Sequence, residues 1–235
     1  MSEMTAARAY ADAVSALVAE HDVADVLVRL VDNCAALFPA DAVAILVSNR
    51  NDQLELLTAS SHRAEELELL QVQHESGPCV DAIATGEPVV GRTADEMVDR
   101  WGTVGTAIVR AGFHAVHAYP MHWRGRAFGG LNVFLRSGSQ VSSEAEELGQ
   151  TLADIATLVV VHSADVPHDQ VTARIHEAVT ARATVEQAKG VLAYRNNVDM
   201  GTAYRLLLDL ASDARAGLGE TARRVVEDQY TDQLG

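Results

Sequence analysis

One region near the C-terminus constrains the fold of this chain more than any other. Residues 182–192 read Arg-Ala-Thr-Val-Glu-Gln-Ala-Lys-Gly-Val-Leu, and a second patterned stretch follows at residues 202–211. In both stretches apolar side chains recur three and four residues apart, which is the spacing of one face of an α-helix. Asn196 and Asn197 favour a break between the two helices, and Asp199 is a suitable N-cap for the second. The predicted inner faces consist of Val185, Ala188 and Leu192 in the first helix, and Ala203, Leu206, Leu207, Leu210 and Ala211 in the second.

A third helix is predicted at residues 219–227. Its apolar residues are Leu218, Ala222, Val225 and Val226. Three short helices with small alanines on their inner faces predict a compact all-α module of roughly sixty residues, which is small for an isolated core.

The pattern of particular residues in this module resembles the ANTAR domain. The resemblance covers about residues 168–230 and is carried by Arg182, Gln187 to Gly190, Ala203, Tyr204, Ala211 and Ala222. It implies an RNA-binding output module of bacterial transcription antiterminators, which bind paired hairpins in nascent transcripts and act on RNA polymerase only indirectly. One departure is Gly219, where a hydroxyl or acidic N-cap is expected, so we predict a third helix that frays at its start.

RNA recognition requires particular residue types, and these select the candidate RNA-contacting residues of this module. Cations hold the phosphate backbone, and a flat ring meets an unstacked loop base. Arg182 and the only lysine of the chain, Lys189, are seven residues apart and should share one side of a helix. The predicted RNA-binding residues are Arg174, Arg182, Lys189, Gly190, Tyr204 and Arg205.

The charge distribution limits how such a module binds a polyanion. The chain has a net charge of −15, but residues 171–205 contain five basic and three acidic side chains. Positive potential is therefore local. We expect RNA binding to be confined to a site, with no general affinity for nucleic acid. A helix-turn-helix DNA-binding regulator is an alternative, which the small number of basic residues disfavours.

The N-terminal two thirds of the chain has the pattern of an α/β domain. A Gly-Pro-Cys segment at residues 77–79 precedes a short helix that ends at Gly86, and a strand hairpin is predicted at residues 114–135. These segments resemble the GAF domain over about residues 10–163. The resemblance implies a sensory domain with a central antiparallel sheet and helices around it, an α/β (α+β) fold. Its small-molecule ligand, if it binds one, is unknown from the sequence.

The two cysteines offer an alternative function. Cys79 lies near a helix start, where the helix dipole lowers a thiol pKa, so a redox sensor or a thiol-dependent redox enzyme that also uses Cys34 is conceivable. A small buried thiol is the simpler interpretation. A haem or metal ligand is not expected at His117. No triad, carboxylate pair or phosphate loop is recognisable, so the chain is predicted not to be an enzyme.

A heptad-like series precedes the output module. It comprises Val141, Ala145, Leu148, Leu152, Ile155 and Val159. This spacing fits a coiled-coil seam, and it fits equally a helix packed on its own sheet. The first interpretation predicts a homodimer through the helix at residues 141–159 and the first output helix. Such a dimer presents two output modules to paired hairpins, across a break at Pro167. No signal segment or membrane span is apparent, so a cytoplasmic protein is expected.

Overall fold

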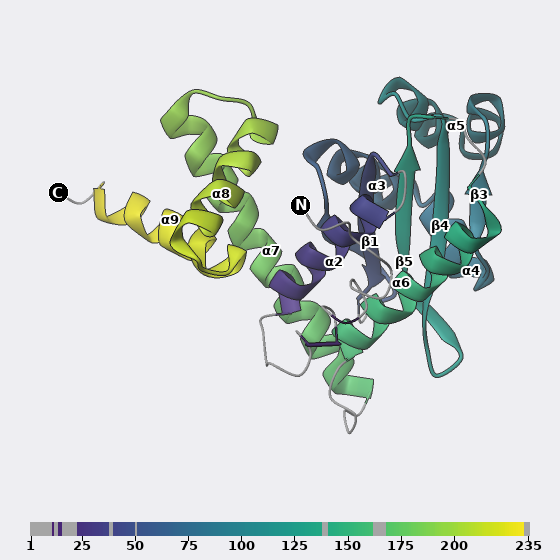
Figure 1. Ribbon diagram of the computed structural model, residues 1–235, viewed down its shortest axis with the longest axis horizontal. Helices are drawn as coiled ribbons and strands as arrows, with labels where there is room; N and C mark the ends of the chain where they lie inside the picture. The colour runs from purple at the N-terminus through teal and green to yellow at the C-terminus, as the bar shows by residue number, and fades with distance from the viewer. Residues whose placement is uncertain are drawn as a thin grey trace.

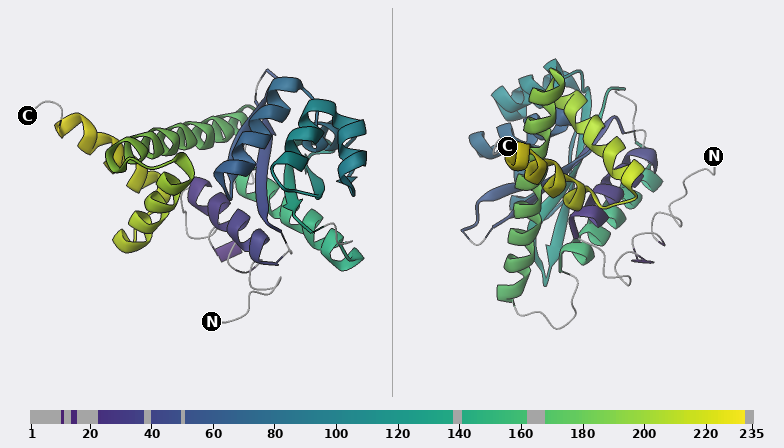
Figure 2. Two further views of the ribbon diagram at one scale, coloured as in Figure 1. Left: turned by 90° about the horizontal axis from the view of Figure 1, so that it is seen from above. Right: turned by 90° about the vertical axis from the view of Figure 1, so that its left-hand side faces the viewer.

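The computed structural model describes residues 11, 14–15, 23–37, 40–49, 51–137, 141–161 and 168–232. An α/β domain with one central sheet is followed by a bundle of three helices, which confirms the predicted fold class (Figure 1). Figure 2 shows that the bundle projects from one end of the α/β domain and that its first helix reaches back toward that domain. The predicted break at Pro167 lies outside the described residues.

The central sheet has five antiparallel strands in the order β2-β1-β5-β4-β3. The strands are β1 Ala42–Ser48, β2 Leu54–Ala59, β3 Val89–Gly91, β4 Ala115–Trp123 and β5 Arg126–Leu135. The predicted hairpin joins β4 to β5 through Arg124 and Gly125, whose φ angles of 50° and 81° suit a tight turn. Strand β3, at the sheet edge, is too short to be recognised as a pattern and was not predicted.

Helices cover both faces of the sheet. The helices are α2 Val23–Leu37 and α6 Ser143–Val161 on one face, and α3 His62–His74, α4 Pro78–Thr85 and α5 Ala94–Arg110 on the other. Alternate residues of β1 point to opposite faces, Val43 and Ile45 to the first and Ala44 and Leu46 to the second, and all four are fully buried. The domain therefore has two apolar cores separated by the sheet.

The heptad-like series of α6 packs within its own domain. Leu152, Ile155 and Val159 are buried between α6, α2 and the sheet. A Cβ on Gly149 would overlap the ring of Tyr119 in β4, so the glycine allows α6 to lie close to the sheet. Of the two interpretations of the series, packing on the sheet is confirmed.

Three helices form the C-terminal bundle. They are α7 His168–Asn196, α8 Met200–Ala214 and α9 Leu218–Asp232. Asp199 caps α8 as predicted, its side chain accepting a hydrogen bond of 2.9 Å from the Thr202 amide. The predicted inner faces form the bundle core with one exception, because the side chain of Leu210 is 43% exposed. Helix α7 extends far beyond the short helix predicted around residues 182–192.

Candidate nucleic-acid interface

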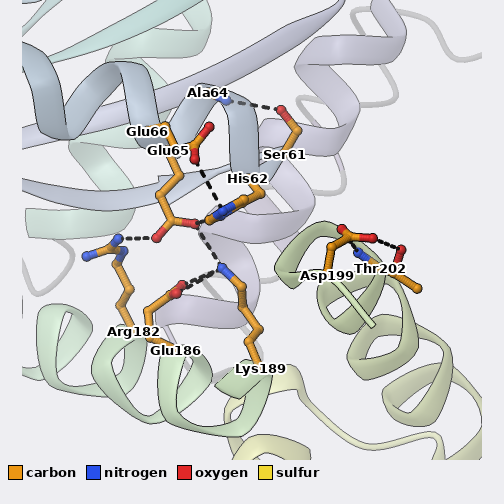
Figure 3. Close-up of polar contacts among 10 residues, drawn as sticks. All are labelled: Ser61, His62, Ala64, Glu65, Glu66, Arg182, Glu186, Lys189, Asp199 and Thr202. Carbon is orange, nitrogen blue, oxygen red and sulfur yellow. Dashed lines mark hydrogen bonds and ion pairs between the residues drawn. The ribbon is translucent and has the colours of Figure 1, made fainter. Parts of the chain in front are cut away.

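The two cations predicted to share a side of α7 do so. Lys189 Nζ donates a hydrogen bond of 2.8 Å to Oε2 of Glu65, and Arg182 Nη2 donates one of 2.6 Å to Oε1 of the same carboxylate (Figure 3). Glu65 lies in the first turn of α3, which Ser61 caps through a hydrogen bond from the Ala64 amide. This side of α7 therefore faces the α/β domain.

Lys189 is enclosed by acidic side chains. Its exposed fraction is 1%, and Nζ also lies 2.9 Å from both carboxylate oxygens of Glu186. Burial opposes ionisation of Glu65, but the hydrogen bonds from Lys189 and His62 and the charges of Lys189 and Arg182 together outweigh it. They hold the pKa of Glu65 below its ordinary value. Burial, together with the charge of Glu65, raises the pKa of Glu186. Glu65 is thus the firmly ionised partner of Lys189.

Tyr204 of α8 lies against the same lysine. Its ring centroid is 5.3 Å from Lys189 Nζ, the geometry of a cation–π contact. The side chain is half-buried, and burial raises the pKa of its hydroxyl. We call Arg182, Lys189 and Tyr204 the cationic patch. It brings together from α7 and α8 the cations and the ring that the sequence suggested.

The other predicted contacts lie elsewhere. Gly190 is exposed, and a Cβ added to it would meet no atom within 4 Å. Arg205 is also exposed and donates a hydrogen bond of 2.8 Å to Thr202 Oγ1. Arg174 belongs to α7, but its side chain lies outside the described part of the structure. The cationic patch therefore faces the α/β domain, whereas Gly190 and Arg205 face solvent.

A second contact joins the α/β domain to the start of α9. Oδ1 of Asp25 in α2 accepts a hydrogen bond of 2.8 Å from the Leu218 amide. Helix α9 starts at Leu218, so the residue before it is Gly217 and not Gly219 as the sequence pattern indicated. A Cβ on Gly217 would overlap the Asp25 carboxylate. An acid from the other domain thus supplies the cap that the local sequence lacks.

Sequence reasoning missed three residues around this interface. Glu65 is 124 positions from Lys189, and Asp25 is 193 positions from Leu218, so no local pattern links them. Tyr194, near the end of α7, is 84% exposed and is followed by Arg195. An aromatic residue next to an arginine beside a predicted helix break was the available signal for Tyr194.

A buried polar cluster lies one helical turn after Glu65 on α3, inside the α/β domain. Glu68 accepts hydrogen bonds from Asn132 Nδ2 (2.7 Å) and Gln71 Nε2 (2.9 Å), and Gln71 Oε1 accepts one from the Cys79 amide (3.0 Å). Burial raises the pKa of Glu68 to about 8, although the hydrogen bond from Asn132 acts in the other direction. Asn132 Oδ1 is buried without a partner. The exchange of its amide atoms would let its oxygen accept a hydrogen bond from the O–H group of the neutral Glu68 carboxyl.

The raised pKa of Glu68 predicts a dependence of stability on pH. The Glu68 carboxyl is neutral in the folded chain and ionised in the unfolded chain between pH about 4.5 and about 8. The free energy of unfolding therefore falls as pH rises through this range. The maximal slope is about 1.4 kcal/mol per pH unit. Glu68→Gln keeps the neutral shape, so its free energy of unfolding should exceed that of the wild type at pH 8.5 and approach it at pH 5. Urea unfolding across this range measures the difference.

Glu66→Gln provides the matched control for this measurement. Glu66 precedes Glu68 by two residues on α3, and its side chain is 66% exposed. Its removal should leave the pH profile of the wild type unchanged. Parallel profiles for wild type and Glu68→Gln would show that Glu68 ionises at its ordinary pKa.

The two cysteines are separated by the sheet. Cys34 belongs to the core under α2 and α6, and Cys79 to the core under α3, α4 and α5. Burial raises the pKa of Cys34 to about 12, and burial with the charge of Glu68 raises that of Cys79 well above its ordinary value. The pair therefore cannot act together without unfolding. Within the described residues no group of three His, Cys, Asp or Glu side chains is placed to hold a metal ion.

Comparison with known families identifies both parts of the chain. The GAF domain family matches residues 20–161, and the ANTAR domain family matches residues 173–226. No curated protein matches the chain. The chain belongs to the GAF domain family and carries, after its GAF sensor domain, an ANTAR domain, which is an RNA-binding antitermination module. The resemblances to the GAF and ANTAR domains that the sequence motifs indicated are thus confirmed.

Solved structures similar to this chain share the GAF fold at low sequence identity. The GAF domain of an Acinetobacter phosphoenolpyruvate-protein phosphotransferase is 19% identical with a TM-score of 0.55, covering 72% of this chain and 99% of that one. The corresponding domain from Coxiella burnetii is 17% identical with a TM-score of 0.53, covering 69% and 96%. The reduced form of fRMsr of Staphylococcus aureus is 14% identical with a TM-score of 0.51, covering 66% and 95%. These likenesses show the fold alone.

Proposed function

We propose that this chain is a signal-responsive regulator of transcription termination. Its ANTAR domain binds paired RNA hairpins in nascent transcripts, and its GAF domain controls that binding. RNA polymerase is affected only through the folding of the transcript. The protein acts in the cytoplasm, in keeping with the finding that no helix in the described residues is long and apolar enough to cross a membrane.

The cationic patch is the observation that supports RNA binding most directly. Two cations and an aromatic ring converge at the junction of α7 and α8, with Lys189 Nζ 5.3 Å from the Tyr204 ring centroid. Loop bases of RNA hairpins are unstacked, so they can stack on a ring while neighbouring phosphates pair with cations. Gly190 and Arg205 are exposed and face solvent, outside the patch. The RNA-binding set predicted from the sequence, Arg174 included, remains our proposal.

A further part of the proposal is that a homodimer engages the two hairpins together. Two linked modules raise the overall affinity for paired sites without new contacts. Because α6 uses its apolar series inside the GAF domain, the dimer contact lies on another surface.

RNA probes that differ only in hairpin number test the function. We expect filter binding to show tighter association with a library of RNAs containing two adjacent hairpins with randomised loops than with single hairpins from the same library. We also expect readthrough of a terminator downstream of the selected pair to increase. Equal binding to unstructured RNA would contradict the function. A monomer in sedimentation at micromolar concentration, with and without the paired RNA, would contradict the dimer.

A thiol-dependent redox enzyme is the alternative from a different class. Nothing in the geometry of the two buried, separated cysteines favours it. Cys79→Ser separates the two functions, since it would remove reductase turnover while leaving RNA binding intact.

A further inference from the structure

Glu65 holds both cations of the patch with one carboxylate. Each of its oxygens accepts from a different cation, Oε1 from Arg182 at 2.6 Å and Oε2 from Lys189 at 2.8 Å. Two anionic oxygens bridging a lysine and an arginine reproduce what a phosphate group offers the same side chains. Figure 3 shows the carboxylate of α3 pointing at both of them.

In this arrangement Lys189, the buried cation of the patch, has no capacity left for RNA. A lysine ammonium has three donors, and Lys189 faces three carboxylate oxygens, one from Glu65 and two from Glu186. Its exposed fraction of 1% leaves no path for a phosphate. Lys189 also lies over the ring of Tyr204, where a base would stack.

We propose that helix α3 of the GAF domain covers the RNA face of the ANTAR domain. The Glu65 carboxylate takes the place of an RNA phosphate on Lys189 and Arg182, and the chain binds RNA strongly only after the two domains separate. This inference rests on the proposed function and adds its regulation. The hydrogen bond from the Leu218 amide to Asp25 is a second contact that separation would break.

The interface has the properties of a contact that can open. The charges of Glu65, Glu186, Arg182 and Lys189 balance, and separation returns Glu65 and the two cations to water, which offsets the loss of the ion pairs. A cavity of ≈ 50 Å³ remains between the domains, lined by Glu65, Tyr204 and neighbouring side chains, so the surfaces are incompletely packed. Helix α3 also holds the buried Glu68 inside the GAF domain, so one helix contacts both the sensor core and the cationic patch.

The single lysine of the chain allows a direct test of closure. Lys189 is the only lysine, so acylation by an amine-reactive reagent followed by peptide mass spectrometry reports its accessibility without interference from other lysines. In the full chain, Glu65→Gln should accelerate acylation of Lys189 by roughly tenfold because the open fraction rises. Glu66→Gln removes the same charge one residue away and should leave the rate unchanged. Glu186→Gln removes a charge beside Lys189 but leaves the Glu65 carboxylate in place, so it controls for the reactivity of the amine itself.

RNA binding by the same variants tests the masking role. For the library of RNAs with two adjacent hairpins, Glu65→Gln should lower Kd by roughly tenfold relative to wild type and Glu66→Gln. Circular dichroism confirms folding, and Glu65→Ala serves as a second opening variant. Acylation of Glu65→Gln at the wild-type rate would overturn the inference, as would faster acylation with unchanged RNA affinity. If acylation accelerates but none of the chains binds RNA, the proposed RNA-binding function is wrong, and the masking role is wrong with it.

Discussion

Replacing Tyr204 by alanine in the Glu65→Gln chain is expected to raise Kd for a two-hairpin RNA by roughly 5- to 150-fold. A stacked base contributes about 1–3 kcal/mol, which corresponds to that range. The Glu65→Gln background is chosen because the patch is then uncovered, so loosening of the domain contact does not mask the lost RNA contact. Filter binding well below the unfolding temperature is the measurement, since the Tyr204 ring also packs on the bundle core and its loss lowers stability.

Three further variants assign the effect to a stacking ring and a cation. Tyr204→Phe in the same background keeps the ring and should retain the affinity of the Glu65→Gln chain. Lys189→Ala in the same background should reduce the salt dependence of binding by a little under one unit of slope, roughly one phosphate contact. Tyr194→Ala changes a ring that is 84% exposed outside the patch and should bind normally. Loss of affinity in Tyr194→Ala alone would place the RNA face at the turn between α7 and α8.

Gly105→Ala is expected to destabilise the GAF domain by about 3 kcal/mol or more, the upper range for overpacking. Helix α5 bends sharply at Gly102, with φ 51° and ψ −114°, and the two halves of the helix contact each other across the bend. A Cβ on Gly105 would overlap the backbone carbonyl of Met97, which no side-chain rotation can relieve. For a chain of this size the melting temperature should fall by roughly 6–12 °C.

Gly190→Ala is the matched control for that substitution. Gly190 lies inside α7, and an added Cβ meets no atom within 4 Å. Alanine is favoured over glycine within a helix by about 1 kcal/mol, so this variant should melt at the wild-type temperature or slightly above it. A similar melting temperature for Gly105→Ala and Gly190→Ala would contradict the close approach of the two halves of α5.

Local patterns predicted most of the helices and strands. The cap at Asp199 and the hairpin at residues 114–135 depend on neighbours in sequence, and the structure confirms both. Strand β3 has only three residues and carries no period. Helix α7 was predicted too short because its N-terminal half lacks a regular apolar stripe, although it remains helical from His168.

The candidate site was predictable in its composition but not in its surroundings. Spacing of seven residues places Arg182 and Lys189 on one side of a helix, and the structure agrees. Which surface that side faces depends on Glu65, 124 positions away from Lys189, and no helical period extends so far. The same limit applies to Leu210, whose apolar character predicted a buried position, whereas it is 43% exposed.

The hydrogen bond between Asp25 and the Leu218 amide has a consequence for how freely such domains can be recombined. Helix α9 is capped by an acid that lies 193 positions earlier in the chain. An ANTAR domain transplanted from this chain onto another sensor would carry the cationic patch with it but leave behind the cap of its last helix. A working chimera therefore needs a new acid at the recipient surface, or a serine or aspartate in place of Gly217. The two domains are separate in sequence, yet the last helix of one is capped by a side chain of the other.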